Sequence, residues 1–263
     1  MARVTLSNGI EINCKVDGLD GAPWLVMSNS LGADLSMWDG QIAMLTAKYR
    51  VLRYDARGHG ESDAPDGPYS FDDLVGDAIA LMDYHGIETA DWIGLSKGAM
   101  TGMGLAIHHG DRFGRMVLAD ARAVATDGYK TMWDQRIVAI NEGGIEGIAD
   151  GSLGLWFTEG WRVANPEATA TARSMILRTD PQGYISSCYA LRNLDYLKDL
   201  GSVSLPVLYL CGSEDKGAPP EDMREIANAT PRSTFVEIAE AGHVANINQP
   251  KAFNAAIGEF LDL

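Results

Sequence analysis

The stretch Ile93-Gly94-Leu95-Ser96-Lys97-Gly98-Ala99 constrains the fold of this chain more than any other. An apolar run ends in Gly-x-Ser-x-Gly, and a helix-like sequence follows. This context predicts a strand, a very tight turn and a helix, with Ser96 in a rarely populated backbone region that costs about 1–3 kcal/mol. Gly94 and Gly98 have no side chains, so the strand and the helix can close around the serine. A hydroxyl held under such strain indicates a nucleophile that attacks a carbonyl carbon.

Gly-x-Ser-x-Gly also arises by chance in glycine-containing chains, where its serine has no catalytic role. The strand before Ser96 and the helix after it favour the nucleophile. The interpretation still depends on a base and an acid in the right order along the chain.

Composition limits the classes of protein to which this chain can belong. Its 263 residues, 46% of them hydrophobic, are enough for one large α/β domain with a substantial core. The net charge of −15 disfavours nucleic acid and anionic membrane surfaces as partners. The apolar runs are too short to cross a bilayer, and the first residues have no signal-peptide core. The three cysteines, Cys14, Cys188 and Cys211, are widely spaced and indicate reduced thiols in a cytoplasmic protein.

Strand-like and helix-like segments alternate up to residue 122, after a hairpin signal at Asn8-Gly9. The alternation predicts a mostly parallel sheet with helices on both faces. From residue 123 to 200 we find only helical segments, most clearly 129–141, 166–178 and 181–197. Strands return at 205–212 and 233–238, with helices at 219–229 and 249–261. We therefore predict one α/β core domain, residues 1–122 and 201–263, with residues 123–200 inserted as a helical cap.

Histidine is the base best matched to neutral pH, and His243 is the best placed of the five in the chain. It lies in a loop directly after the last predicted strand. Loops that follow parallel strands gather at one edge of the sheet, where ligands bind. The others lie in a glycine turn or at helix ends that we expect to face solvent: His59, His85, His108 and His109.

Two aspartates could orient this base. Asp215 directly follows the strand-like run 207–210, and Asp120 ends an earlier strand that reaches the same edge. The order Ser96, Asp215, His243 matches the serine, acid, histidine order of α/β-hydrolases, which favours Asp215. Asp120 stays open as the alternative.

The oxyanion of the transition state needs two hydrogen-bond donors. We assign them to the backbone N–H groups of Lys97, which follows the nucleophile, and of Leu31, in a loop after the strand 24–28. The Lys97 ammonium could favour the serine alkoxide or bind an anionic group of the substrate. It could also pack below the turn and pair with a carboxylate such as Asp120, which we favour.

With these residues, the chain resembles the α/β-hydrolase superfamily throughout its length, and within it the 3-oxoadipate enol-lactone hydrolases. The resemblance rests on Ser28-Asn29-Ser30-Leu31-Gly32 with Met37-Trp38-Asp39, on Tyr54-Asp55-Ala56-Arg57-Gly58-His59-Gly60-Glu61-Ser62, on Trp156-Phe157-Thr158, and on Gly183-Tyr184 through Ala190-Leu191-Arg192. It implies a triad of Ser96, Asp215 and His243, no metal or other cofactor, a helical cap over the pocket, and opening of an enol-lactone ring in aromatic catabolism.

The chain departs from this family at two positions. Lys97 replaces the methionine that usually follows the serine, and Leu155 replaces an arginine that often precedes Trp-Phe-Thr. A substrate carboxylate would then need Lys97 or Arg192. A less polar lactone, such as an acyl-homoserine lactone, would suit a cap lined by tryptophans, although these could equally pack the cap against the core. The residues that we expect to contact substrate are Asn29, Ser30, Trp38, Trp133, Trp156 and Arg192, with Trp161 as a further tryptophan of the cap.

We therefore expect a cofactor-free serine hydrolase that acts on a small carboxylic ester, with a lactone as the first choice. The alternatives are a general carboxylesterase, a carbon–carbon bond hydrolase or perhydrolase with the same triad, and a hydrolase-fold receptor with little turnover. Nothing in the sequence points to a macromolecular partner, and the oligomeric state, a homo-oligomer included, stays open.

Overall fold

An eight-stranded sheet runs through the centre of the molecule in the order β1-β2-β4-β3-β5-β6-β7-β8. The computed structural model describes residues 1–263. β1 and β2 form the predicted antiparallel hairpin, β2 pairs antiparallel with β4, and all later pairs are parallel. The strands are β1 Ala2–Thr5, β2 Glu11–Asp17, β3 Trp24–Ser28, β4 Arg50–Tyr54, β5 Ala90–Leu95, β6 Phe113–Ala119, β7 Val207–Gly212 and β8 Ser233–Ile238.

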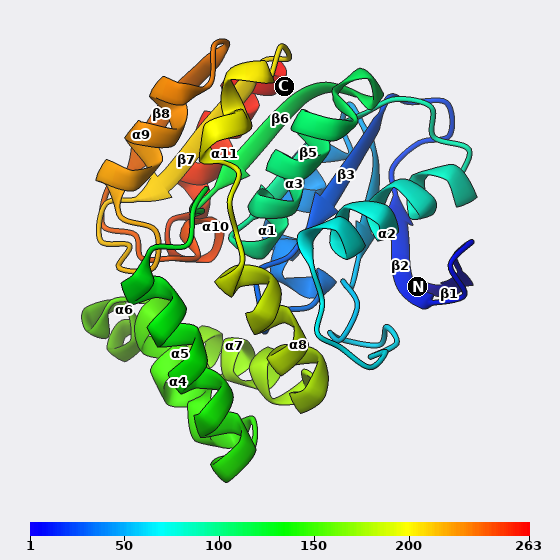
Figure 1. The fold of residues 1–263 in the computed structure, drawn as a ribbon. Coiled ribbons are helices and arrows are strands. Elements are labelled where there is room, and N and C mark those ends of the chain that lie inside the picture. Colours follow the sequence, from blue (N-terminus) through cyan, green and yellow to red (C-terminus); the bar gives the residue numbers. More distant parts are fainter.

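Helices cover both faces of this sheet (Figure 1). One face carries α2 (Phe71–Tyr84), α3 (Lys97–His108) and α9 (Pro220–Ala229), and the other carries α1 (Asp39–Leu45) and α11 (Pro250–Leu261). The short elements are η1 Leu35–Trp38, η2 Gly110–Arg112, η3 Leu197–Ser202 and α10 Ala245–Asn248. The layers follow from the sequence, because β-α-β alternation places successive helices against a parallel sheet.

Five further helices lie between β6 and β7, and we call them the cap helices. They are α4 Asp127–Gly143, α5 Glu146–Trp156, α6 Glu159–Ala164, α7 Pro166–Arg178 and α8 Pro181–Arg192. Figure 1 shows them as a separate group at one end of the sheet. α8 ends five residues before the predicted limit of 197, and the chain beyond it is extended at Asp195, which forms an antiparallel bridge with Val124.

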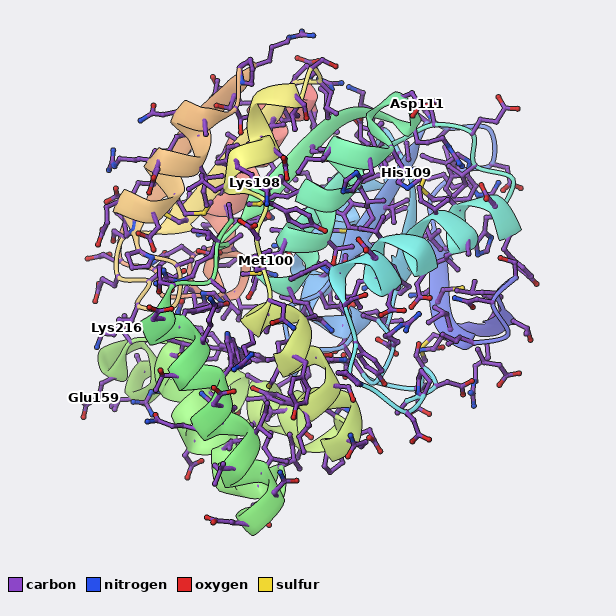
Figure 2. All side chains as sticks on the ribbon, viewed as in Figure 1. Met100, His109, Asp111, Glu159, Lys198 and Lys216 are labelled. Atoms are coloured by element: carbon purple, nitrogen blue, oxygen red, sulfur yellow. The ribbon has the colours of Figure 1, made fainter.

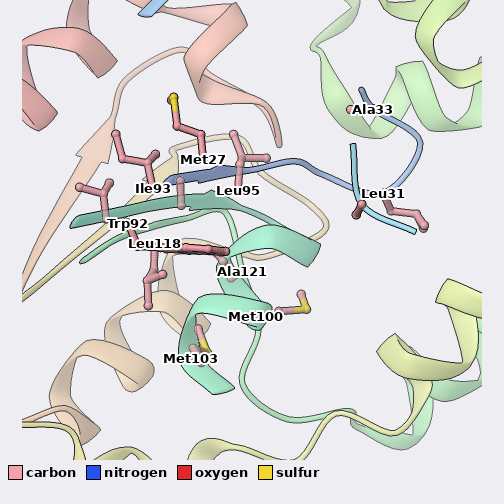
Figure 3. Packing of buried hydrophobic residues seen from close by; sticks show 14 of the residues in the cluster. Met27, Leu31, Ala33, Trp92, Ile93, Leu95, Met100, Met103, Leu118 and Ala121 are labelled. Carbon is pink, nitrogen blue, oxygen red and sulfur yellow. The ribbon is translucent and has the colours of Figure 1, made fainter. Parts of the chain in front are cut away.

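The central strands are buried on both faces, so they read as continuous apolar runs rather than as alternating patterns. Trp92, Ile93, Leu95 and Leu118 are fully buried in this layer (Figure 3). Leu31 and Met100 lie on the side of the core that faces the cap helices, where the sheet layer ends. No helix of the structure has the length and apolar character that a membrane crossing requires.

Candidate active site

Ser96 occupies the tight turn between β5 and α3 that the sequence predicted. Its backbone has φ 53° and ψ −115°, in the region that disfavours residues with side chains. A Cβ atom on Gly94 would lie 2.2 Å from the carbonyl oxygen of Gly98, and one on Gly98 would lie 2.2 Å from that of Ser28. Only glycine at both positions allows the helix to approach the strands this closely. The surrounding backbone therefore holds the strained serine in place.

The hydroxyl of Ser96 donates a hydrogen bond to Nε2 of His243, with Oγ and Nε2 2.9 Å apart. Nδ1 of His243 lies 2.8 Å from Oδ2 and 3.0 Å from Oδ1 of Asp215. A carboxylate only accepts hydrogen bonds, so the imidazole proton lies on Nδ1 and Nε2 is left as an acceptor. Oδ1 of Asp215 also accepts from the N–H groups of Gly217 (2.7 Å) and Ala218 (3.0 Å). In this arrangement His243 can remove the proton of Ser96 while Asp215 holds the imidazole.

Asp120, the alternative acid, has no hydrogen bond to His243. Its Oδ1 accepts from the N–H of Gly212 at 2.9 Å and its Oδ2 from the N–H of Ala245 at 3.4 Å. The side chain is fully buried, and burial together with the nearby charge of Asp215 raises the pKa of Asp120 well above its ordinary value. Of the two acids predicted from the sequence, Asp215 is therefore the one that lies against the imidazole.

Two backbone N–H groups are available for an oxyanion. Leu31 lines the pocket above Ser96, and its N–H has no acceptor within the protein. Lys97 is the first residue of α3, where an N–H group has no acceptor within the helix. The assignment of both groups to an oxyanion hole stays a prediction.

The side chain of Lys97 turns away from the pocket and is buried below the turn. Its Nζ lies 3.1 Å from Nδ1 and 3.2 Å from Nε2 of His59, and it forms no ion pair with a carboxylate. The expectation that Lys97 packs below the turn agrees with this burial, whereas the expected ion pair with Asp120 is not formed. Lys97 is not among the residues that line the pocket. Burial lowers the pKa of Lys97 to about 7 and, with the lysine charge, that of His59 well below its ordinary value.

A pocket opens above Ser96 and His243, between the core and the cap helices. Its cap side includes Tyr129, Met132, Trp133 and Arg136, spaced so that they share one face of α4. Leu155 and Trp156 from α5 and Tyr184 from α8 complete this apolar wall. Met100, in the first turn of α3, also lines the pocket, and Figure 2 shows it at the end of α3 that faces the cap helices. Trp133, Trp156 and Ser30 are thus in the pocket, as expected.

Arg136 is the cation of this pocket, and sequence reasoning missed it. Its Nη1 donates to Oγ of Ser152 (2.8 Å) and to the carbonyl oxygen of Ile148 (3.3 Å), while no carboxylate of the protein pairs with it. A signal was present, because Arg136 lies three residues after Trp133 and therefore on the same face of the predicted helix. An arginine without an anionic partner beside an apolar wall is suited to bind a ligand carboxylate.

Three residues expected to contact substrate are not among those that line the pocket. Trp38 is fully buried in the core, where its ring packs 6.5 Å from that of Phe253 between ring centroids. Arg192 is on the surface and pairs with Asp134 at 2.6 Å, since its position on α8 faces away from the pocket. Asn29 is also buried, and its amide donates to the carbonyl of Ala33. Trp161, for which packing and pocket lining were both open, stacks on Phe157 and donates to the carbonyl of Asn248.

A strained serine at a strand–helix turn, a histidine and an aspartate from later loops, and a mostly parallel sheet under a helical cap together define an α/β-hydrolase. The model of the alpha/beta hydrolase family matches residues 21–256, and the chain belongs to this family. It is 38% identical to 3-oxoadipate enol-lactonase 2 of Acinetobacter baylyi, over 94% of this chain and 92% of that protein. The predicted resemblance is confirmed.

Solved structures agree with this assignment. The enol-lactonase of Burkholderia xenovorans LB400 superposes with a TM-score of 0.96 at 38% identity, covering 100% of both chains. A thermophilic esterase of Thermogutta terrifontis, solved with malate bound, superposes with a TM-score of 0.92 at 27% identity, covering 99% of this chain and 97% of that one. The α/β-hydrolase fold predicted from the sequence is thereby confirmed.

Proposed function

We propose that this chain is a serine hydrolase that opens a lactone bearing a carboxylate, by way of an acyl-enzyme on Ser96. The chain is an enzyme of the carboxylic ester hydrolase type, as its likeness to enol-lactonases indicates. The observation that carries the proposal is the hydrogen bond of 2.9 Å between Ser96 and His243, beneath a pocket that contains Arg136.

The chemistry follows from this geometry. Oγ of Ser96 bonds to the lactone carbonyl carbon while His243 takes its proton, and the charge that develops on the carbonyl oxygen is held by the N–H groups of Leu31 and Lys97. When the tetrahedral intermediate collapses, the ring C–O bond breaks and His243 returns the proton to the ring oxygen. A water molecule, deprotonated by His243, then attacks the acyl carbon and releases Ser96.

Arg136 supports a substrate that carries a negative charge. The protein supplies no carboxylate to this guanidinium, so a ligand carboxylate would be its ion-pair partner. The chain's net charge of −15 gives no general attraction for anions, so the attraction must come from a local cation of this kind. 3-Oxoadipate enol-lactone, the substrate named for the relatives at 38% and 31% identity, is therefore our leading candidate.

The setting of this reaction is part of the same proposal. Opening of that lactone belongs to aromatic catabolism, as the resemblance to enol-lactone hydrolases implies. The three cysteines are all free and buried, which fits a reducing compartment such as the cytoplasm.

A substrate panel tests the proposal directly. It should contain 3-oxoadipate enol-lactone, a neutral lactone of the same ring size, acyl-homoserine lactones, an aryl acetate and a ring-cleavage diketone. We expect the highest kcat/KM for the lactone with the carboxylate, and an acyl adduct on Ser96 by mass spectrometry after rapid acid quench. A maximum on the diketone or on long-chain neutral lactones would contradict the proposed substrate class.

A further inference from the structure

Asp120 links the loop of the proposed triad acid to the loop of the proposed base. It follows β6, and its two carboxyl oxygens accept hydrogen bonds from the N–H groups of Gly212 (2.9 Å) and Ala245 (3.4 Å). Gly212 ends β7, three residues before Asp215, and Ala245 lies two residues after His243. One side chain therefore holds both loops.

The contacts around Asp120 hold its backbone in a strained conformation. Its φ is 51°, in the left-handed region that favours glycine, yet the residue carries a side chain. Such a conformation costs on the order of 1 kcal/mol and persists only where surrounding contacts impose it. The N–H of Asp120 donates to the carbonyl of Leu210 at 2.8 Å, which fixes the residue against β7.

The two loops are packed against each other at the same place. The N–H of Glu214 donates to the carbonyl of Ala241 at 2.9 Å. A Cβ atom on Gly212 would lie 2.3 Å from the carbonyl oxygens of both Ala241 and Gly242. The loops thus touch through their backbones, and Asp120 lies across the point of contact.

The charge state of Asp120 suits this position. No lysine or arginine pairs with the carboxyl group, which is fully buried. Burial, and after it the nearby charge of Asp215, raises the pKa of Asp120. A raised pKa favours the neutral form of Asp120, which needs no cationic partner.

We propose that Asp120 is a positioning residue, which holds the Asp215 and His243 loops at the separation that aligns His243 with Ser96. The inference rests on the proposed role of Ser96 as nucleophile but not on the identity of the substrate. It can therefore be tested with a reagent that reports only on the reactivity of the serine.

The experiment compares Asp120→Ala, Asp120→Asn and Asp215→Asn. The readouts are the rate at which a fluorophosphonate labels Ser96 and the kcat and KM for p-nitrophenyl acetate. A loop displaced by about 1 Å costs about 10²-fold in rate, so we expect Asp120→Ala to lower the labelling rate and kcat by about that factor, with KM within about twofold. Asp120→Asn keeps one acceptor oxygen for the N–H groups of Gly212 and Ala245, so it should lose less than Asp120→Ala in both readouts and stay within about tenfold of wild type.

Asp91→Ala is the matched control. Asp91 also holds a backbone N–H, that of Arg115 at 2.8 Å, but at the start of β5, the opposite end of the sheet from Ser96. We expect this variant to lower the unfolding midpoint without slowing the labelling of Ser96. If Asp120→Ala fails to fold, the test is the comparison of Asp120→Asn with Asp215→Asn. Asp215→Asn should lose about 10⁴-fold in kcat.

Two results would overturn the positioning role: wild-type labelling of folded Asp120→Ala, or a loss in Asp120→Asn as large as that in Asp215→Asn. A wild-type chain that the reagent does not label would instead overturn the nucleophile, and with it the proposed function. The two failures are therefore distinguishable.

Discussion

Arg136 on α4 and Leu155 on α5 line the same pocket above Ser96. This chain has Leu155 where the family resemblance implies an arginine, and the cation that lines the pocket, Arg136, comes from the neighbouring helix. A guanidinium without an anionic partner should contribute chiefly to the binding of a charged substrate.

We therefore expect Arg136→Gln to raise KM for a lactone with a carboxylate by about 10–100-fold, because a charged hydrogen bond contributes about 1.5–3 kcal/mol. KM for a neutral lactone should change by less than about twofold. Steady-state kinetics on both substrates provides the measurement, and Arg192→Gln, on the surface, is the control. An equal effect of Arg136→Gln on both substrates would indicate that Arg136 only supports the cap through Ser152.

Ser96→Ala should lower kcat by at least about 10⁴-fold, because the attacking oxygen is removed while the oxyanion donors remain. The circular dichroism spectrum and the unfolding midpoint should stay close to those of wild type, since alanine removes only the Oγ atom. Turnover of p-nitrophenyl acetate at near wild-type rate by this variant would refute the assignment of the nucleophile.

Lys97→Met should stabilise the protein, and the gain should depend on pH. Burial lowers the pKa of Lys97 from 10.5 to about 7, so between these values the unfolded chain binds a proton that the folded chain does not. The contribution of Lys97 to the free energy of unfolding therefore rises with pH across this range, by up to about 1.4 kcal/mol per pH unit. The advantage of Lys97→Met should be a few kcal/mol near pH 6 and shrink toward pH 10.

Urea unfolding of wild type and Lys97→Met at pH 6, 8 and 10 measures this difference. Lys97 is a buried base, so the cost of burying its charge lowers stability in full below pH 7. This cost disappears above the pKa that Lys97 has in the unfolded chain. A difference that stays constant over the whole range would show that Lys97 does not titrate there.

Gly183→Ala should loosen the contact between α8 and the core. A Cβ atom at this position would lie 2.4 Å from Cα and 2.6 Å from the carbonyl oxygen of Gly58, so one backbone must move. We expect a loss of about 1–3 kcal/mol in the free energy of unfolding, as in other overpacked sites. KM should rise too, because Tyr184, the next residue, lines the pocket.

Gly151→Ala is the control for this change, and thermal unfolding of both variants provides the measurement. Gly151 lies within α5, and a Cβ atom there would meet no other atom within 4 Å. Alanine should stabilise that helix by up to about 1 kcal/mol. If Gly183→Ala were equally stabilising, the close approach of Gly58 would have no energetic consequence.

Local chemistry explains why the core of this site could be predicted. The turn at Ser96 requires glycine at positions 94 and 98, because a side chain there would meet backbone atoms. Both glycines lie within two residues of Ser96, so the sequence shows the requirement directly. The loops of Asp215 and His243 follow strands of a parallel sheet, so they reach the edge where Ser96 lies, whatever the details of packing.

The walls of the pocket could not be predicted in the same way. The side on which a residue of the cap lies depends on how its helix is rotated against its neighbours. Arg192 and Arg136 are both basic residues of cap helices, yet one faces solvent and the other the pocket. Trp38, in a stretch that matches related enzymes, belongs to the core rather than to the pocket.

Sequence by itself determined the α/β layers, the strained turn at Ser96 and the order of serine, acid and histidine, because each depends on neighbouring residues or on the direction of parallel strands. Only the tertiary structure decided that Asp215 rather than Asp120 meets the imidazole, that Lys97 is buried against His59, and that Arg136 supplies the charge of the pocket. The physical reason is that side-chain contacts between distant segments are set by packing, which residue spacing along the chain does not specify.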